Sequence, residues 1–183
     1  MVNLAPGVLL IADPFLKDPN FMRTVVLVTE YKEDGAVGFV LNRQYENTLD
    51  ELLPEVEGHQ LPVYYGGPVQ MNTIHFLHSY GDEIPGGVEV SSGVYWGGDF
   101  EAVVSLINSG QIDRDKIRFF IGYSGWSTGQ LEEEIEEKTW LKAEATHELV
   151  FHSQAQEIWK DSLKHLGGEY EMMINFPIDP QLN

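Results

Sequence analysis

The chain contains no cysteine, which excludes disulfides, iron–sulfur clusters, cysteine-ligated zinc and a thiolate nucleophile. It has no apolar run that approaches the roughly 18 to 20 residues needed to span a bilayer. Its opening residues 1–6 lack a basic region, and Asp13 and Pro14 interrupt the first apolar run. We therefore expect no signal peptide, no membrane segment and a cytoplasmic location.

Basic residues are also scarce. Eleven Lys and Arg stand against 29 Asp and Glu, which leaves a formal net charge of −18. Carboxylates repel the phosphate groups of nucleic acids and of anionic membranes. Direct nucleic-acid binding is therefore disfavoured. A surface of this kind is typical of a protein kept soluble by charge, and it leaves a cationic partner open.

The amino-acid composition of the chain predicts a globular protein. With 43% hydrophobic residues in 183, the chain can bury a proper core as a single domain over residues 1–183. Expected strands dominate the first half and expected helices the second, which predicts an α+β fold. The expected strands cover residues 7–13, 23–30, 36–41, 62–65, 73–80 and 88–91; the expected helices cover residues 49–53, the stretch between Asp99 and Gly110, and residues 155–166.

The stretch RFFIGYSGWSTGQLEEEIEE, residues 118–137, invites a chemical interpretation because glycines break an apolar run before an acidic helix. A nucleophile on a strand-to-helix turn needs G-x-S-x-G, but the glycine after Ser124 comes one position early. Histidines that could complete a triad follow Ser124 in the expected order, namely His147, His152 and His165. Phosphate-binding glycine loops do not fit, because no lysine follows the glycines. Ser124 therefore stays a weak candidate nucleophile.

A capping interpretation explains the second half of this stretch better. With Ser127 as N-cap, Gln130 occupies the third helical position of a capping box. Trp126 and Leu131 then occupy the two positions of a hydrophobic staple. The pattern predicts a turn at residues 122–125 and a helix that begins directly after Ser127. Helix capping does not explain why Tyr123, Ser124 and Gly125 precede this helix.

Signals for metals and cofactors are weak. His75 and His78 are spaced like a metal pair, but residues i and i+3 of a strand point to opposite faces. No Asp-x-Asp-x-Asp-Gly loop for calcium occurs. We therefore expect neither a metal nor a cofactor. Arg23 is expected to donate hydrogen bonds to loop carbonyls or to Asp18, with an anion-binding role as the alternative.

Several spaced blocks resemble the AlgH/YqgE family of bacterial proteins. They are PGVLLIADP (residues 6–14), DPNFMRTVV (residues 18–26), GAVGFVLNR (residues 35–43), YGGPV (residues 65–69) and GYSGW with GQLE (residues 122–126 and 129–132). Four or more motifs in the right order make the resemblance specific. Two positions depart from the family pattern: Gln44 stands where proline is common, and Tyr31 where histidine is common.

The resemblance implies a compact α+β fold in which a bent sheet is partly closed into a barrel, with helices packed outside. It supplies no catalytic residues to carry over. The family label comes from a proposed role in the regulation of alginate production. Given the charge of this chain, such a role would run through a protein partner rather than DNA.

Three functions therefore remain in competition: binding of a protein or small-ligand partner without catalysis, hydrolysis through Ser124, and transcriptional regulation. The first is favoured because no catalytic motif is intact. A ligand site would require the polar residues of the blocks to converge on one pocket. These candidate ligand-binding residues are Asp13, Asn20, Arg23, Asn42, Tyr123 and Ser124.

Overall fold

The structure is a computed structural model that describes residues 2–177. Its strands are β1 (Val8–Ala12), β2 (Val25–Lys32), β3 (Gly35–Val40), β4 (Gln44–Thr48), β5 (Pro62–Tyr65), β6 (Val69–His78), β7 (Val88–Ser91), β8 (Val94–Trp96), β9 (Ile117–Ser127) and β10 (Trp140–Glu144). Its α-helices are α1 (Leu49–Leu52), α2 (Phe100–Asn108), α3 (Gln130–Glu136), α4 (His147–Val150) and α5 (Ile158–Leu166). Short 3-10 helices cover Pro54–Val56, Gly81–Glu83, Ala155–Glu157 and Gly168–Asn175.

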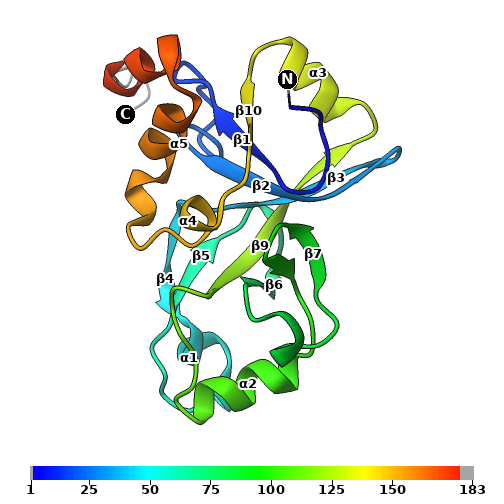
Figure 1. Cartoon of the computed structure of the whole chain (residues 1–183), viewed down its shortest axis with the longest axis vertical. Coiled ribbons are helices and arrows are strands. Elements are labelled where there is room, and N and C mark those ends of the chain that lie inside the picture. The colour runs from blue at the N-terminus through cyan, green and yellow to red at the C-terminus, as the bar shows by residue number, and fades with distance from the viewer. Residues whose placement is uncertain (1, 178–183) are drawn as a thin grey trace.

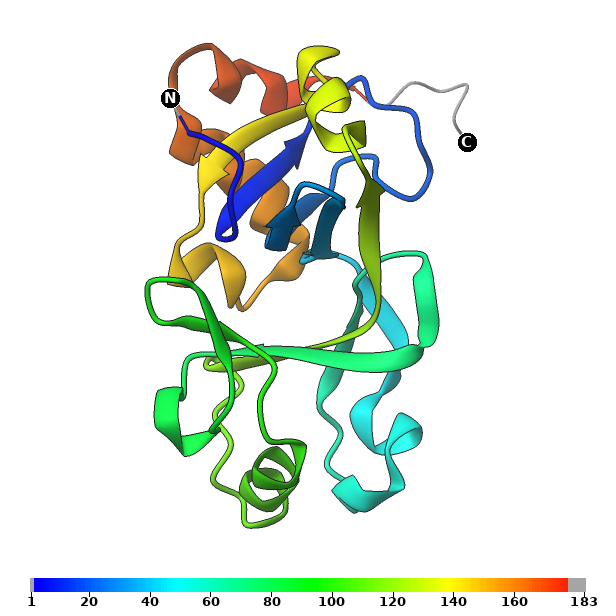
Figure 2. The same ribbon diagram turned by 90° about the vertical axis from the view of Figure 1, so that its right-hand side faces the viewer.

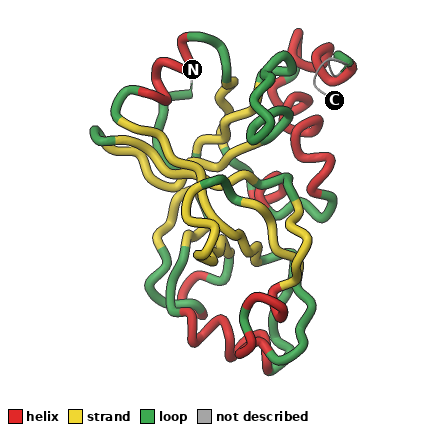
Figure 3. Tube along the Cα trace, turned by 180° about the vertical axis from the view of Figure 1, so that it is seen from behind, coloured by secondary structure: helices red, strands yellow, loops and turns green. Residues whose placement is uncertain are grey.

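The strands form one strongly bent sheet, in the order β10-β1-β2-β3-β9-β6-β8-β7, with β5 also on β9 and β4 on β5. Strand β9 belongs to both halves of this sheet. Its first part pairs with β6 and, in parallel, with β5, and its last four residues pair with β3. Figure 2 shows β9 bending upward from the lower half into the upper half. The helices lie at the periphery of the crossing strands (Figure 3).

Strand β1 and residues 25–28 of β2, in the upper half, are apolar throughout and buried on both faces. In β1, Leu9 and Ile11 belong to a core beneath α5, and Leu10 belongs to a second core beneath α3. Strand β2 alternates in the same way, and all five residues of β1 are buried. A strand covered on both faces has an unbroken apolar sequence instead of an alternating one. A third core fills the lower half between β5, β6, β9 and α2 (Figure 1).

The two halves meet where glycine backbones cross. A β-carbon on Gly66 would lie 2.4 Å from the carbonyl oxygen of Gly122, and one on Gly122 would lie 2.5 Å from that of Gly67. The carbonyl oxygen of Gly66 accepts hydrogen bonds from the backbone N–H of Val40 at 2.9 Å and from the Ser124 hydroxyl at 3.0 Å. These two hydrogen bonds join the segment after β5 to both β3 and β9.

The prediction of a turn at residues 122–125 is therefore wrong: these residues are part of β9. Gly122 has a φ of 69°, which bends the strand without ending it. The predicted helix start is also wrong, because the N-cap of α3 is Gly129 rather than Ser127. Half of the predicted capping box still forms, since Gln130 Oε1 accepts the backbone N–H of Ser127 at 3.0 Å. Trp126 and Leu131 are both buried in the core beneath α3.

The predicted α+β class, with a bent, half-closed sheet and outer helices, is confirmed. Asp99 caps α2 by accepting the backbone N–H of Glu101, and Thr48 begins α1 with a capping box. The expected strands and helices do not include β4, β8, β9, β10 or α4. Within residues 2–177, no helix is long and apolar enough to cross a membrane.

We expect Gly122→Ala to destabilise the fold far more than Gly93→Ala. Both glycines have left-handed φ values, 69° and 75°, which cost an alanine about 1–2 kcal/mol. A β-carbon on Gly93 meets nothing within 4 Å, so this variant measures the backbone term alone. In Gly122→Ala the new β-carbon also clashes with the carbonyl oxygen of Gly67. This variant should lose more than about 4 kcal/mol of its free energy of unfolding, or fail to fold. Urea denaturation of both variants measures the difference, and equal losses would contradict the crossing.

His78 is fully buried in β6 in a neutral form. Its Nε2 donates to the carbonyl oxygen of Gly97 at 2.9 Å, and its Nδ1 accepts the backbone N–H of Tyr80 at 3.2 Å. A second proton at Nδ1 would break the latter bond. Burial lowers the pKa of His78, although the Gly97 carbonyl opposes the shift. Burial also lowers the pKa of His75.

Because these folded-state pKa values lie below the unfolded value of about 6.5, the unfolded chain takes up protons first. Stability is therefore complete above about pH 6.5 and falls as the pH drops toward the lowered folded values, by at most about 1.4 kcal/mol per pH unit for each histidine. Urea midpoints between about pH 7.5 and 5.5 measure this slope. His78→Asn should have a shallower slope; an unchanged slope would disprove the assignment.

Candidate functional site

Three predicted ligand-binding residues meet around the loop between β1 and β2. Asn42 Oδ1 accepts the backbone N–H of Val25 at 3.0 Å, and its Nδ2 donates to the carbonyl oxygen of Arg23 at 2.9 Å. The Tyr65 hydroxyl donates to Asn20 Oδ1 at 3.4 Å. The structure thus brings Asn20, Arg23 and Asn42 together as anchors of this loop.

Arg23 and Asp13 also make local structural contacts. The guanidinium of Arg23 lies 4.6 Å from the centre of the Trp159 ring and donates to the carbonyl oxygen of Phe176. Burial lowers its pKa. The predicted bond to a carbonyl is therefore present, but it reaches the C-terminal segment and not the loop or Asp18. Asp13 Oδ1 accepts the backbone N–H two residues further on, at 2.9 Å.

Tyr123 and Ser124 lie on β9, apart from this loop. Ser124 is completely buried and donates its hydroxyl to Gly66. Tyr123 is half-buried, with its ring edge-on to His75 at 5.9 Å. The histidines that follow Ser124 in the sequence line a different part of the molecule. None of the six predicted residues lines either of the two pockets described next.

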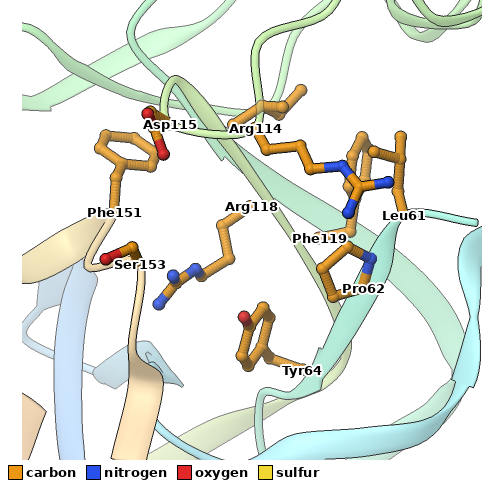
Figure 4. Close-up of a pocket in the computed structure, with 10 residues that line it drawn as sticks. Leu61, Pro62, Tyr64, Arg114, Asp115, Arg118, Phe119, Phe151 and Ser153 are labelled. Atoms are coloured by element: carbon orange, nitrogen blue, oxygen red, sulfur yellow. The ribbon is translucent and has the colours of Figure 1, made fainter. Parts of the chain in front are cut away.

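The first pocket, which we call the inner pocket, lies between β5, the start of β9 and the segment after α4. Its volume is about 250 Å³. Figure 4 shows the side chains of Arg118 and Tyr64 directed into the space, with Ser153 facing them from the other wall. The lining residues are Leu61, Pro62, Tyr64, Arg114, Asp115, Ile117, Arg118, Phe119, Phe151 and Ser153.

Arg118 is the central group of the inner pocket. It is 6% exposed, and its guanidinium lies 4.3 Å from the centre of the Tyr64 ring. It donates to the carbonyl oxygens of Leu41, at 3.3 Å, and His152. No ion pair within residues 2–177 includes Arg118. Burial lowers its pKa, yet an arginine guanidinium stays charged in proteins. The pocket therefore holds a buried cation without a carboxylate partner.

Tyr64 adds a free donor beside this cation. The side chain is 8% exposed, and within residues 2–177 its hydroxyl takes part in no hydrogen bond of the structure. Within residues 2–177, Ser162 Oγ is the one buried side-chain oxygen or nitrogen without a partner, so the Tyr64 hydroxyl itself is accessible. The next residue, Tyr65, lies on the opposite face of β5 and does have a partner in Asn20. The hydroxyl of Tyr64 is therefore available to a molecule in the pocket.

A larger cleft, which we call the outer cleft, adjoins the inner pocket and shares Asp115, Phe151 and Ser153 with it. Its volume is about 1040 Å³. The other residues that line it are Thr146, His147, Glu148, Leu149, His152, Asp161, Lys164 and His165. Within residues 2–177, no three His, Asp or Glu side chains are grouped to hold a metal ion.

His152 in this cleft has both ring nitrogens engaged. Its Nε2 lies 2.7 Å from Asp161 Oδ2, and its Nδ1 accepts the backbone N–H of Gln154 at 3.0 Å. An imidazole held in this way donates at Nε2 and accepts at Nδ1. Neither nitrogen is left to take a proton from the neighbouring Ser153. His152 and Ser153 therefore do not form an assembled base and nucleophile in this structure.

Sequence reasoning missed Arg118 although it stands in the stretch that drew most attention. The signal was a single charged residue inside an otherwise apolar strand, between Ile117 and Phe119. A charge in a buried strand must be paired or solvated. The sequence could not show that Tyr64 and Phe151 lie on either side of it.

The fold and the pocket together define an α+β protein with a half-closed barrel and a small, arginine-centred pocket at the bend of its sheet. The chain belongs to the AlgH-like family, whose model matches residues 9–171. It is 47% identical over 187 residues to a UPF0301 protein of Chlorobium limicola, with all of both chains covered. It is 46% identical to a UPF0301 protein of Chlorobaculum tepidum, with 98% of this chain and 96% of that one covered.

Two solved structures resemble the fold. The solution structure of the AlgH protein from Pseudomonas aeruginosa superimposes with a TM-score of 0.73 and 28% identity, covering 97% of this chain and 98% of that one. The crystal structure of DIP2367 from Corynebacterium diphtheriae gives a TM-score of 0.80 at 22% identity, covering 96% and 94%. The latter likeness concerns the fold alone.

We expect no reaction of Ser124 with a fluorophosphonate probe in the native protein, because its hydroxyl is buried and bound to Gly66. Mass spectrometry of the β9 peptide, with a known serine hydrolase in the same sample as control, measures labelling. Ser124→Ala should remain folded and lose about 1 kcal/mol of stability with the lost hydrogen bond. A labelled Ser124 in native protein would contradict this structural role.

Proposed function

We propose that this protein is a binding protein for a small anionic ligand, a carboxylate, held in the inner pocket by Arg118. The observation that carries the proposal is a buried guanidinium without an ion pair, beside a tyrosine hydroxyl that makes no hydrogen bond within the described residues. Burying a charge is costly unless it is paired. A bound anion would supply the partner and accept the Tyr64 hydroxyl.

The shape and lining of the pocket support a carboxylate with a short apolar body. Arginine presents a planar fork of donors that matches a carboxylate. The Ser153 hydroxyl and, at the rim, Arg114 add donors to the same space. Leu61, Pro62 and Phe151 line the remaining wall and would contact carbon atoms. A volume of about 250 Å³ suits a small molecule.

Binding is preferred over the two other hypotheses. The hydroxyl of Ser124 faces Gly66, and His152 next to Ser153 has no free nitrogen, so a hydrolase lacks support. Direct contact with DNA is disfavoured by the net charge of −18. A regulatory role through a protein partner, and the cytoplasmic location expected from the sequence, both remain part of the proposal.

The sharpest test replaces each of two adjacent tyrosines on β5 by phenylalanine, one at a time. Hexanoate should bind the native protein, and neutral hexanamide should bind far more weakly. Tyr64→Phe removes a donor to a charged ligand and should weaken hexanoate binding by about tenfold, which is about 1.4 kcal/mol. Tyr65→Phe loses a hydroxyl on the opposite face and should bind as the native protein does. Calorimetric titration measures the affinity of the native protein for hexanoate and for hexanamide, and the affinity of each variant for hexanoate.

A second pair of variants separates binding from stability. Arg118 and Arg23 each stack on an aromatic ring and donate to a backbone carbonyl, but only Arg118 lines the pocket. Arg118→Gln should abolish hexanoate binding, whereas Arg23→Gln should not. Equal binding of hexanoate and hexanamide, or equal loss in Tyr64→Phe and Tyr65→Phe, would overturn the proposal.

A further inference from the structure

The inner pocket and the outer cleft adjoin each other, and the sign of the charge that lines them differs. They share Asp115, Phe151 and Ser153. The inner end holds the guanidinium groups of Arg114 and Arg118. The outer cleft has three carboxylates against one ammonium, that of Lys164, when its histidines are neutral. A ligand that extends through both parts therefore meets positive charge first and negative charge afterwards.

The carboxylates of the outer cleft are not equally available. Asp161 already lies against His152 at 2.7 Å and Lys164 at 3.8 Å. Asp115 and Glu148 are exposed and take part in no ion pair within residues 2–177. Asp115 borders both spaces, and in Figure 4 its carboxylate lies beside the Phe151 ring, at the same side of the pocket. These two groups are free to pair with a cation.

An apolar side chain stands between the two charged regions. Phe151 is 5% exposed and lines both spaces. A carbon chain that passes it can pack against the ring without leaving a polar group unpaired. Phe151 and Asp115 therefore both lie at the border between the pocket that holds Arg118 and the cleft that holds the other carboxylates.

We infer that the ligand is a zwitterion, an aminocarboxylate whose carboxylate and ammonium groups are separated by a short apolar chain. This inference rests on the proposed function, because the carboxylate end occupies the site at Arg118. The ammonium lies in the outer cleft and pairs with Asp115 and Glu148. A ligand with anionic groups at both ends is disfavoured by the same carboxylates.

The test compares ε-aminohexanoate with hexanoate and with hexylamine on the full chain by calorimetric titration. The zwitterion should bind about threefold to fivefold more tightly than hexanoate, as expected for an ion pair with exposed carboxylates. Hexylamine should bind more weakly than both, because it leaves Arg118 without an anion. The affinities of aminocarboxylates with shorter and longer chains then show which chain length best fits the distance between Arg118 and the carboxylates of the outer cleft.

Asp115→Asn should affect the two ligands differently. It should weaken the binding of ε-aminohexanoate toward the level of hexanoate, while hexanoate itself should not bind more weakly than before. A purely structural role for Asp115 would weaken both. Glu148→Gln should act in the same direction, and Glu144→Gln, an exposed carboxylate on β10 outside both spaces, should change neither.

The outcomes separate this inference from the proposed function. If hexanoate binds as tightly as ε-aminohexanoate, or Asp115→Asn weakens both equally, the zwitterion is overturned and carboxylate binding stands. If none of the ligands binds, or hexylamine binds as tightly as ε-aminohexanoate, both the inference and the carboxylate site at Arg118 are overturned.

Discussion

At the centre of the molecule, the carbonyl oxygen of Gly66 accepts one hydrogen bond from β3 and one from Ser124 on β9. This contact is possible because Gly66, Gly67 and Gly122 carry no side chains where the backbones cross. The bend of β9 at Gly122 follows from it. So does the division of the sheet into an upper half beneath α5 and a lower half against α2 (Figure 1). Most of the fold is arranged around this crossing.

The pocket is a product of the same bend. Arg118 stands at the start of β9, in the lower half, and its guanidinium reaches the carbonyl oxygens of Leu41 and His152 in the upper half. Because the sheet turns there, the segment after α4 faces β5 across a space that a flat sheet would not leave. The groups that line this space come from three distant parts of the chain. Their chemistry depends on a geometry that no single segment contains.

The sequence predicted well what local patterns decide. The apolar runs of β1 and β2, and the capped and striped α2, were correctly placed because burial and capping act over a few residues. The glycines near residue 122 were taken for a turn, since a positive φ is normally used for one. Their actual reason is the approach of Gly66 and Gly67, which is a contact between distant segments and leaves no local pattern.

The predicted site residues illustrate the same limit. Asn42 and Arg23 are polar residues beside buried strands, which is equally expected for a ligand site and for a loop anchor. In the structure their partners, the backbone of Val25 and the carbonyl oxygen of Phe176, are those of a loop anchor. Arg118 was overlooked because its neighbours in the sequence are apolar, while its neighbours in space, such as Tyr64, are unknown until the chain is folded.

Strand β9 also limits how the chain can vary in length. One continuous strand serves both halves of the sheet, and side chains alternate between its faces. A single residue inserted between Phe120 and Trp126 would exchange the faces of everything that follows it in the strand. Trp126 would leave the core beneath α3, or Arg118 would lose its place in the pocket. The number of residues in β9 is therefore fixed by the packing of Trp126 in the core at one end and of Arg118 in the pocket at the other.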